Sequence, residues 1–207
     1  AKVHMPWYQE MAHTPFFVWD PRSGVQSERR TCLVQPSLDL GPTLLEFFGI
    51  ERDEYMLGHA LGDVVAGDQP VREAALFGHH GGQVNVTDGR YVYMRGPVTE
   101  TNAPLHNYTL MPTHMRSAFS PDELQNAEFV PGFSHMRGCK VLRTEAGGRW
   151  PSQCQYGHLL FDLERDPNER SPLSDAAVED RMINHLVKLM RTCDAPDEQY
   201  VRLGLNP

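Results

Sequence analysis

The stretch Asp39-Leu40-Gly41-Pro42-Thr43-Leu44-Leu45-Glu46-Phe47-Phe48-Gly49-Ile50 carries the most definite local signals in this sequence. It predicts a helix over residues 37–48, because Asp39 is a residue type that caps helices and Pro42 is tolerated in a first turn, where its missing N–H has no partner. Gly49 then supplies the left-handed residue that ends a helix. The helix is expected to pack against a core through a wide apolar face, formed by Leu44, Leu45, Phe47 and Phe48.

Residues 14–20, before this helix, form a short and almost fully apolar run that contains Pro15 and is followed by Pro21. Such a run predicts a strand buried on both faces, as in a parallel sheet covered by helices. Its partner is expected at residues 32–34. The basic stretch between them, residues 22–30, is then an exposed loop.

After residue 82 the sequence takes on the pattern of an antiparallel sheet. Residues 84–87 and 90–95 are rich in β-branched and aromatic residues, and Asp88-Gly89 lies between them, which is the strongest short-range signal of a hairpin. Residues 175–193 place apolar side chains at helical spacing and predict an amphipathic helix with Val178, Met182, Leu186, Leu189 and Cys193 on one stripe. The other predicted elements are strands at 105–111, 139–143 and 158–163 and a short helix at 121–126.

Composition limits the class of protein. The chain has 207 residues and 40% hydrophobic content, enough for one sizeable core. Its net charge is −8 with acidic and basic residues interspersed, so neither nucleic acid nor a membrane is an expected partner. The four cysteines contain no C-x-x-C pair. They are expected to be buried free thiols, with a Cys139–Cys154 bridge across a hairpin as the alternative.

Four separated motifs resemble those of the sulfatase family, in the family's order. The stretch at 39–50 is similar to D-L-x-P-T-L-L-x-x-x-G-I, and Phe161–Glu169 to Y-D-L-x-x-D-P-x-E. Residues 2–22 resemble the segment that begins with the family's sulfate-contacting lysine. Residues 58–61 and 72–78 resemble G-x-S-L and the strand that follows it, with His59-Ala60 departing from the usual serine.

The resemblance implies an α/β, alkaline-phosphatase-like sulfatase fold, of which this chain is expected to be the carboxy-terminal part. Residues 1–76 are then the carboxy-terminal remnant of the large α/β domain. Residues 77–207 form a small α+β domain with an antiparallel sheet and a terminal helix. No cysteine is followed by Pro two residues later, as the family's nucleophile motif requires. The parent is therefore expected to be a sulfuric ester hydrolase, and this chain to be inactive alone.

The resemblance also implies candidate site residues. Lys2 matches the catalytic lysine, whose ammonium is a compact charge suited to a sulfate oxygen. His79 and His80, in Gly78-His79-His80-Gly81-Gly82, are expected to bind substrate, because imidazoles bind anions and glycines allow close approach. His4 and His13 flank the lysine segment and are expected to line the same cleft. No metal ligand is assigned in this chain; the parent is expected to use Ca²⁺ or Mg²⁺ and a formylglycine supplied by other residues.

Two other functions stay open. Relatives on the same scaffold hydrolyse phosphonate or phosphate esters, and they share the lysine. The chain is alternatively a non-catalytic fragment or assembly module. For the sulfatase interpretation the parent's substrate is a sulfated small molecule or sugar, and the exposed core predicts self-association or association with an amino-terminal sulfatase half.

Overall fold

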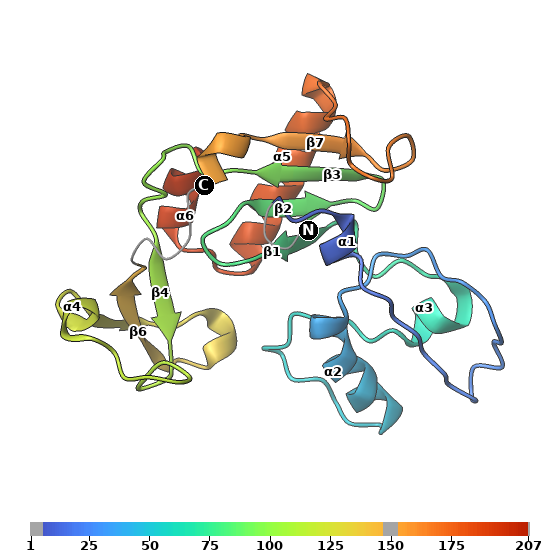
Figure 1. Ribbon diagram of the computed structural model, residues 1–207. Helices are drawn as coiled ribbons and strands as arrows, with labels where there is room; N and C mark the ends of the chain where they lie inside the picture. The colour runs from blue at the N-terminus through green and yellow to red at the C-terminus, as the bar shows by residue number, and fades with distance from the viewer. Residues whose placement is uncertain (1–5, 147–152, 207) are drawn as a thin grey trace.

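The computed structural model describes residues 6–146 and 153–206, and two antiparallel sheets organise this part of the chain (Figure 1). The larger sheet has the order β1-β2-β3-β7, with every neighbouring pair antiparallel. Its central hairpin turns at Asp88-Gly89, as predicted, and Asp88 Oδ1 accepts the N–H groups of Arg90 and Tyr91. The strands are β1 (Ala75–Gly78), β2 (Val84–Thr87), β3 (Tyr91–Arg95) and β7 (Leu159–Asp162). The sheet thus begins before the domain boundary expected at 76/77, and that division stays a prediction.

Helix α5 (Ala176–Thr192) lies along one face of the larger sheet, and α6 (Asp197–Leu203) packs against the same core (Figure 1). The N-cap of α5 is Asp175, whose carboxylate accepts the N–H groups of Ala177 and Val178, so the predicted amphipathic helix is confirmed. Cys193 was expected on its buried stripe but is exposed, because it lies past the last helical residue. This core contains Val86, Tyr93, Leu160, Met182, Leu186, Met190, Tyr200 and Leu203.

The opposite face of the larger sheet buries a smaller cluster of Val92, Met94 and Phe161. Tyr8, just before α1 (Gln9–Ala12), packs edge-on against Phe161 with the ring centroids 6.1 Å apart. The amino-terminal segment therefore covers part of this face, in front of β1 and β2 in Figure 1.

The smaller sheet lies between β3 and β7 in the chain and has the order β4-β6-β5. Strands β4 (His106–Thr109) and β6 (Lys140–Glu145) and helix α4 (Pro121–Leu124) confirm the expected elements. Ser120 and Glu123 form a capping box at the N-terminus of α4. Strand β5 (Glu128–Pro131) was not predicted. The 3-10 turns η1 (Ser134–Met136) and η2 (Gln153–Tyr156) complete this part.

Residues 13–74 differ most from expectation. The predicted strands at 14–20 and 32–34 are not strands, and the run 14–20 is exposed rather than buried. Phe17 and Trp19 are 91% and 86% exposed. A strand is stable only when a neighbour completes its hydrogen bonds, and both described sheets are built from residues 75–162. No parallel strand pair occurs among residues 6–146 and 153–206.

Helix α2 (Pro36–Phe47) confirms the predicted helix with one correction. Pro42 lies inside the helix, not in its first turn, because the helix begins at Pro36. Gly49 has φ 68° and ends the helix as expected. The N–H of Ile50 donates to the carbonyl of Leu45, and that of Gly49 to Glu46, which is the hydrogen-bond pattern of a Schellman motif. The short helix α3 (Gly62–Gly67) follows.

Asp39 holds this amino-terminal part together. Its carboxylate is fully buried and forms a two-pronged ion pair with Arg72, at 2.5 and 2.6 Å. The same carboxylate accepts the backbone N–H groups of Gln35, before α2, and of His59, at 2.6 and 2.9 Å. The Arg72 pair lowers the pKa of Asp39 against the opposing effect of burial. Asp39 was expected to be the helix cap, but the N-cap is Gln35 and Asp39 lies in the first turn of α2, because the helix begins earlier than predicted. Its carboxylate instead ties α2 to the chain leading into β1.

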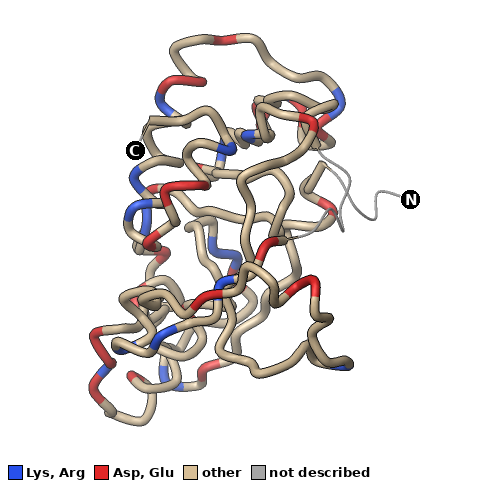
Figure 2. The backbone as a smooth tube through the Cα atoms, turned by 90° about the vertical axis from the view of Figure 1, so that its left-hand side faces the viewer, with Lys and Arg blue, Asp and Glu red and all other residues tan. Residues whose placement is uncertain are grey.

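The four cysteines are free, as expected, but they are not buried: Cys139 and Cys193 are exposed, and Cys32 and Cys154 are half-buried. In the part of the chain that the structure describes, no helix has the length and apolar character needed to span a membrane. Figure 2 shows acidic and basic positions interleaved along the backbone. The architecture is mixed α/β, with two small antiparallel sheets and carboxy-terminal helices.

Candidate anion-binding site

The turn after β1 carries two of the predicted site residues, His79 and His80. Gly78 has φ 140°, and a Cβ there would lie 2.8 Å from the carbonyl oxygen of Gln83, so a glycine is needed. At Gly82 a Cβ would lie 2.1 Å from the ring of His79. The sequence analysis predicted that these glycines allow a ligand to approach the backbone closely. At Gly82 the His79 imidazole occupies that space instead.

His79 packs against the amino-terminal segment. Its ring stacks on Trp7 with the centroids 5.4 Å apart and the planes 22° apart. Two residues later, the N–H of Gln9 donates to the buried Glu169 carboxylate at 2.5 Å. Glu169 is the last residue of the motif at 161–169. These contacts fix the segment that follows Lys2 in the sequence beside the His79-His80 turn.

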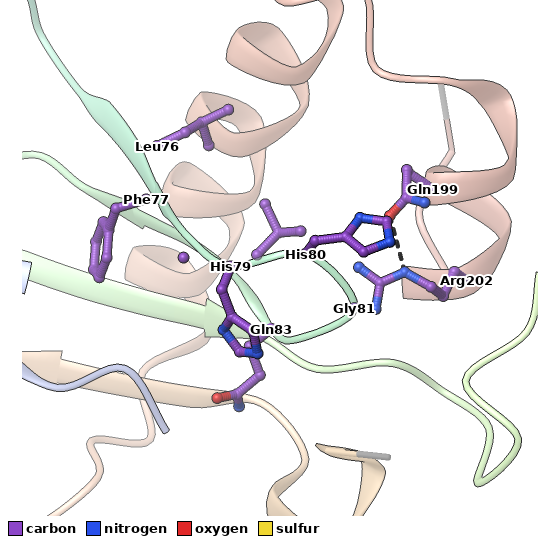
Figure 3. A pocket seen from close by; sticks show the side chains of 10 residues that line it. Leu76, Phe77, His79, His80, Gly81, Gln83, Gln199 and Arg202 are labelled. Carbon is purple, nitrogen blue, oxygen red and sulfur yellow. Dashed lines mark hydrogen bonds between the residues drawn. The ribbon is translucent and has the colours of Figure 1, made fainter. Parts of the chain in front are cut away.

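His80 lies at a pocket of about 330 Å³ between the end of β1 and helix α6 (Figure 3). The polar lining comes from His79, His80, Gln83, Gln199 and Arg202, and β1 and β2 add an apolar wall. Gln83 is buried, and its amide N–H donates to the carbonyl of Gly157 at 3.1 Å. Figure 3 shows the Arg202 guanidinium beside the His80 ring, so two nitrogen-rich groups from distant parts of the chain meet in one hollow.

Arg202 is 1% exposed, and its hydrogen bonds go to neutral groups. Nε donates to the Gln199 side-chain oxygen at 2.9 Å, and Nη1 donates to Gly82 O and Asn102 Oδ1, both at 3.0 Å. Burial lowers the pKa of Arg202 to about 10, while nearby Glu198 opposes that shift, so the group stays charged near neutral pH. Arg202 forms no ion pair with any carboxylate of residues 6–146 and 153–206. The site therefore carries a buried positive charge that no described carboxylate pairs with directly, although Glu198 acts on it from nearby.

Burial also lowers the pKa of His80, and the positive charge of Arg202 adds to this effect. A hydrogen bond with Asn107 and the charge of Glu198 act in the opposite direction. Near neutral pH the ring is therefore uncharged, and one of its nitrogens is engaged by Asn107, which leaves the other for the pocket. A bound anion would reverse this preference, because negative charge stabilises the imidazolium.

The structure brings together only some of the predicted site residues. His79 and His80 line the same pocket. His13 is exposed at the end of α1 and does not line it, and its predicted place in the cleft of the Lys2 segment stays a prediction. Lys2 and His4 lie outside the described residues. Sequence analysis missed Arg202 and Gln199, and the only signal for them was a short amphipathic pattern after Pro196.

The described residues provide no ligand set for a metal. No group of at least three His, Cys, Asp or Glu side chains within residues 6–146 and 153–206 is arranged to hold an ion. The Ca²⁺ or Mg²⁺ expected of a sulfatase parent therefore has no ligand set among these described residues.

His158 makes stability depend on pH. Its Nδ1 accepts the N–H of Gly96 at 3.2 Å, which requires that nitrogen to be unprotonated, and burial and then the charge of Arg95 lower its pKa. A folded-state pKa below the unfolded value means stability is full above about pH 6.5 and is lost as pH falls below it. The free energy of unfolding in urea should therefore fall between about pH 7.5 and 5.5. His158→Gln keeps an acceptor and should flatten this slope, whereas His59→Ala, on an exposed ring, should preserve it. An unchanged slope in His158→Gln would contradict the assignment.

Two solved structures are similar to part of this chain. The structure of a 2-O GAG sulfatase matches at 17% identity and a TM-score of 0.45, and the match covers 80% of this chain and 26% of that one. A putative sulfatase from Bacteroides thetaiotaomicron VPI-5482 matches at the same identity and TM-score, covering 86% of this chain and 29% of its own. The chain thus spans less than a third of the length of each of these chains. No family model and no curated protein matches the sequence.

Proposed function

We propose that this chain is the carboxy-terminal part of a sulfatase whose whole form hydrolyses a sulfate monoester. The observation that carries the proposal is the meeting of three distant motif segments at one place. The segment after Lys2 contacts the His79-His80 turn through Trp7, and it contacts the motif ending at Glu169 through Gln9. Residues that resemble sulfatase motifs therefore share contacts, as parts of one working site would.

The chemistry assigns different tasks to these residues. Cleavage of a sulfate ester builds negative charge on the sulfuryl and leaving oxygens, so positive groups and imidazoles aimed there lower the barrier. Lys2 would supply an ammonium to those oxygens, and His79 and His80 would help to bind the sulfated substrate. The nucleophilic formylglycine and the divalent cation belong to residues outside this chain.

The isolated chain should show no turnover of aryl sulfates. It contains neither the nucleophile motif nor a described metal-ligand set, and Lys2 alone provides neither attack nor a cation. The measurement is release of the aryl alcohol with Ca²⁺ or Mg²⁺ added, against a preparation of the Lys2→Ala variant purified in the same way. Turnover above buffer that disappears in Lys2→Ala would contradict the proposal.

The coding sequence upstream of Ala1 tests the proposal and separates its competitors. An open frame encoding C-x-P-x-R and Asp-His-Gly supports the sulfatase. Thr or an unmodified Ser at the nucleophile position favours phosphonate or phosphate ester hydrolysis on the same scaffold. A genuine start codon at the beginning of this chain favours a non-catalytic module.

A further inference from the structure

We propose that the pocket formed by Arg202, His80 and Gln199 binds an oxyanion group on a sugar-sized ligand. This group is either a carboxylate or a sulfate. The proposal rests on the proposed function only for the statement that this ligand is the sulfatase substrate. Arg202 stands outside the residues that the sulfatase resemblance assigns, so the pocket adds a recognition element to that function.

The first argument is the charge of Arg202. A buried guanidinium is strongly destabilising unless an opposite charge compensates it. The three acceptors around it, on Gln199, Gly82 and Asn102, satisfy hydrogen bonds but carry no charge. Because no described carboxylate pairs with this guanidinium directly, an oxyanion in the pocket would supply the missing contact charge.

The second argument is that the nearest acidic side chain is already engaged. Glu198 accepts a hydrogen bond from the His106 backbone N–H at 3.1 Å, and its other carboxylate oxygen pairs with the His106 ring. Glu198 is therefore not directly paired with Arg202, and its effect on the pKa of Arg202 is smaller than that of burial. The charge remains available to a ligand.

The third argument is the direction of the free donor. Nε and Nη1 of Arg202 are occupied, which fixes the plane of the guanidinium. Nη2 has no hydrogen-bond partner within the described chain, and the guanidinium borders the pocket beside His80 (Figure 3). An oxyanion placed there receives an N–H from Nη2 and, because it favours the protonated ring, an N–H from the His80 imidazolium; such charge-assisted hydrogen bonds are stronger than neutral ones.

The remaining lining selects the kind of ligand. No Asp or Glu lines the pocket, so a cation gains nothing there. The volume of about 330 Å³ is at the lower end of the range for small-molecule sites. Leu76, Phe77 and Val84 provide an apolar wall, which suits the carbon face of a sugar.

Titration of the isolated chain with sodium sulfate and, separately, sodium acetate tests the site, with sodium chloride holding ionic strength constant. The readout is the His80 ring resonance by NMR, followed against pH. Saturable binding should raise the His80 pKa, because the anion favours the imidazolium; the charged side chains facing this ring are Arg202 and Glu198. Response to sulfate alone, to acetate alone or to both supports the site and identifies its anion; response to neither overturns it.

Variants complete the experiment. Arg202→Met should weaken anion binding by about 10- to 100-fold and His80→Ala by a smaller factor, as expected for the loss of a charged donor and a neutral one. His59→Ala, at an exposed ring, is the matched control and should bind like the parent chain. If Arg202→Met does not fold, His80→Ala decides alone, followed by calorimetry. Unchanged affinity in His80→Ala would then overturn the site. Because binding is measured without turnover, its failure leaves the sulfatase proposal standing, and the reverse also holds.

Discussion

Asp39→Asn is expected to lower the free energy of unfolding by about 3–5 kcal/mol, the scale measured when one partner of a buried ion pair is removed. The substitution leaves the side chain of Arg72, only 8% exposed, without its counter-charge. It also weakens the acceptor for two backbone N–H groups. Urea unfolding followed by circular dichroism measures the loss, and hydrogen exchange should show it first in α2.

Two further variants make this prediction specific. Asp63→Asn removes an exposed carboxylate in the first turn of α3 and should change stability by less than about 0.5 kcal/mol. The double variant Asp39→Asn/Arg72→Met removes the unpaired charge and should recover part of the loss. If Asp39→Asn is as stable as the parent chain, the buried pair has no organising role.

We propose that the purified chain self-associates or binds a partner chain through its exposed apolar residues in the amino-terminal part. Phe17 and Trp19 are almost fully exposed, and Phe48 of the α2 end is 69% exposed. The two segments are joined where the Arg22 guanidinium lies 4.0 Å from the centre of the Phe47 ring. Monomers rarely leave such apolar surface uncovered. Sedimentation at physiological ionic strength should therefore show a dimer or larger species.

The double variant Phe17→Ser/Trp19→Ser should weaken this association by on the order of 10²-fold or more, since burying one large apolar side chain contributes about 1.5–3 kcal/mol. Phe129→Ser is the control, because Phe129 is 72% exposed but lies on β5 of the other sheet. A parent chain that sediments as a single monomeric species at high concentration counts against self-association.

The sequence predicted those elements whose signals are local. The Asp88-Gly89 turn and Gly49 after α2 each act on neighbouring residues, so their predictions were confirmed. The strand expected at 14–20 failed because an apolar run becomes a strand only beside another strand, and that partner is not encoded in the run. Strand β5 was missed because it ends on Pro131 and its side chains are mostly exposed.

In the candidate site, too, the sequence predicted the residues with local signals and missed those that depend on distant contacts. The turn Gly78-His79-His80-Gly81-Gly82 was recognisable because glycine and histidine are informative residue types in one short segment. Arg202 was not, because its burial depends on Gly82 and Asn102, which lie far away in the chain. In sequence it is one arginine in a polar helix, and only the tertiary structure shows that it is buried without a directly paired carboxylate.

The smaller sheet occupies the interval between two strands that are neighbours in the larger one. Met94 of β3 and Leu159 of β7 are register partners although the whole smaller sheet separates them in the chain. The entropy of closing such a loop grows only logarithmically, by roughly 0.6 kcal/mol for each doubling of its length. The interval is therefore thermodynamically tolerant of changes in length, and its main consequence is kinetic: β3 acquires its last neighbour only after a long-range chain search, which slows folding.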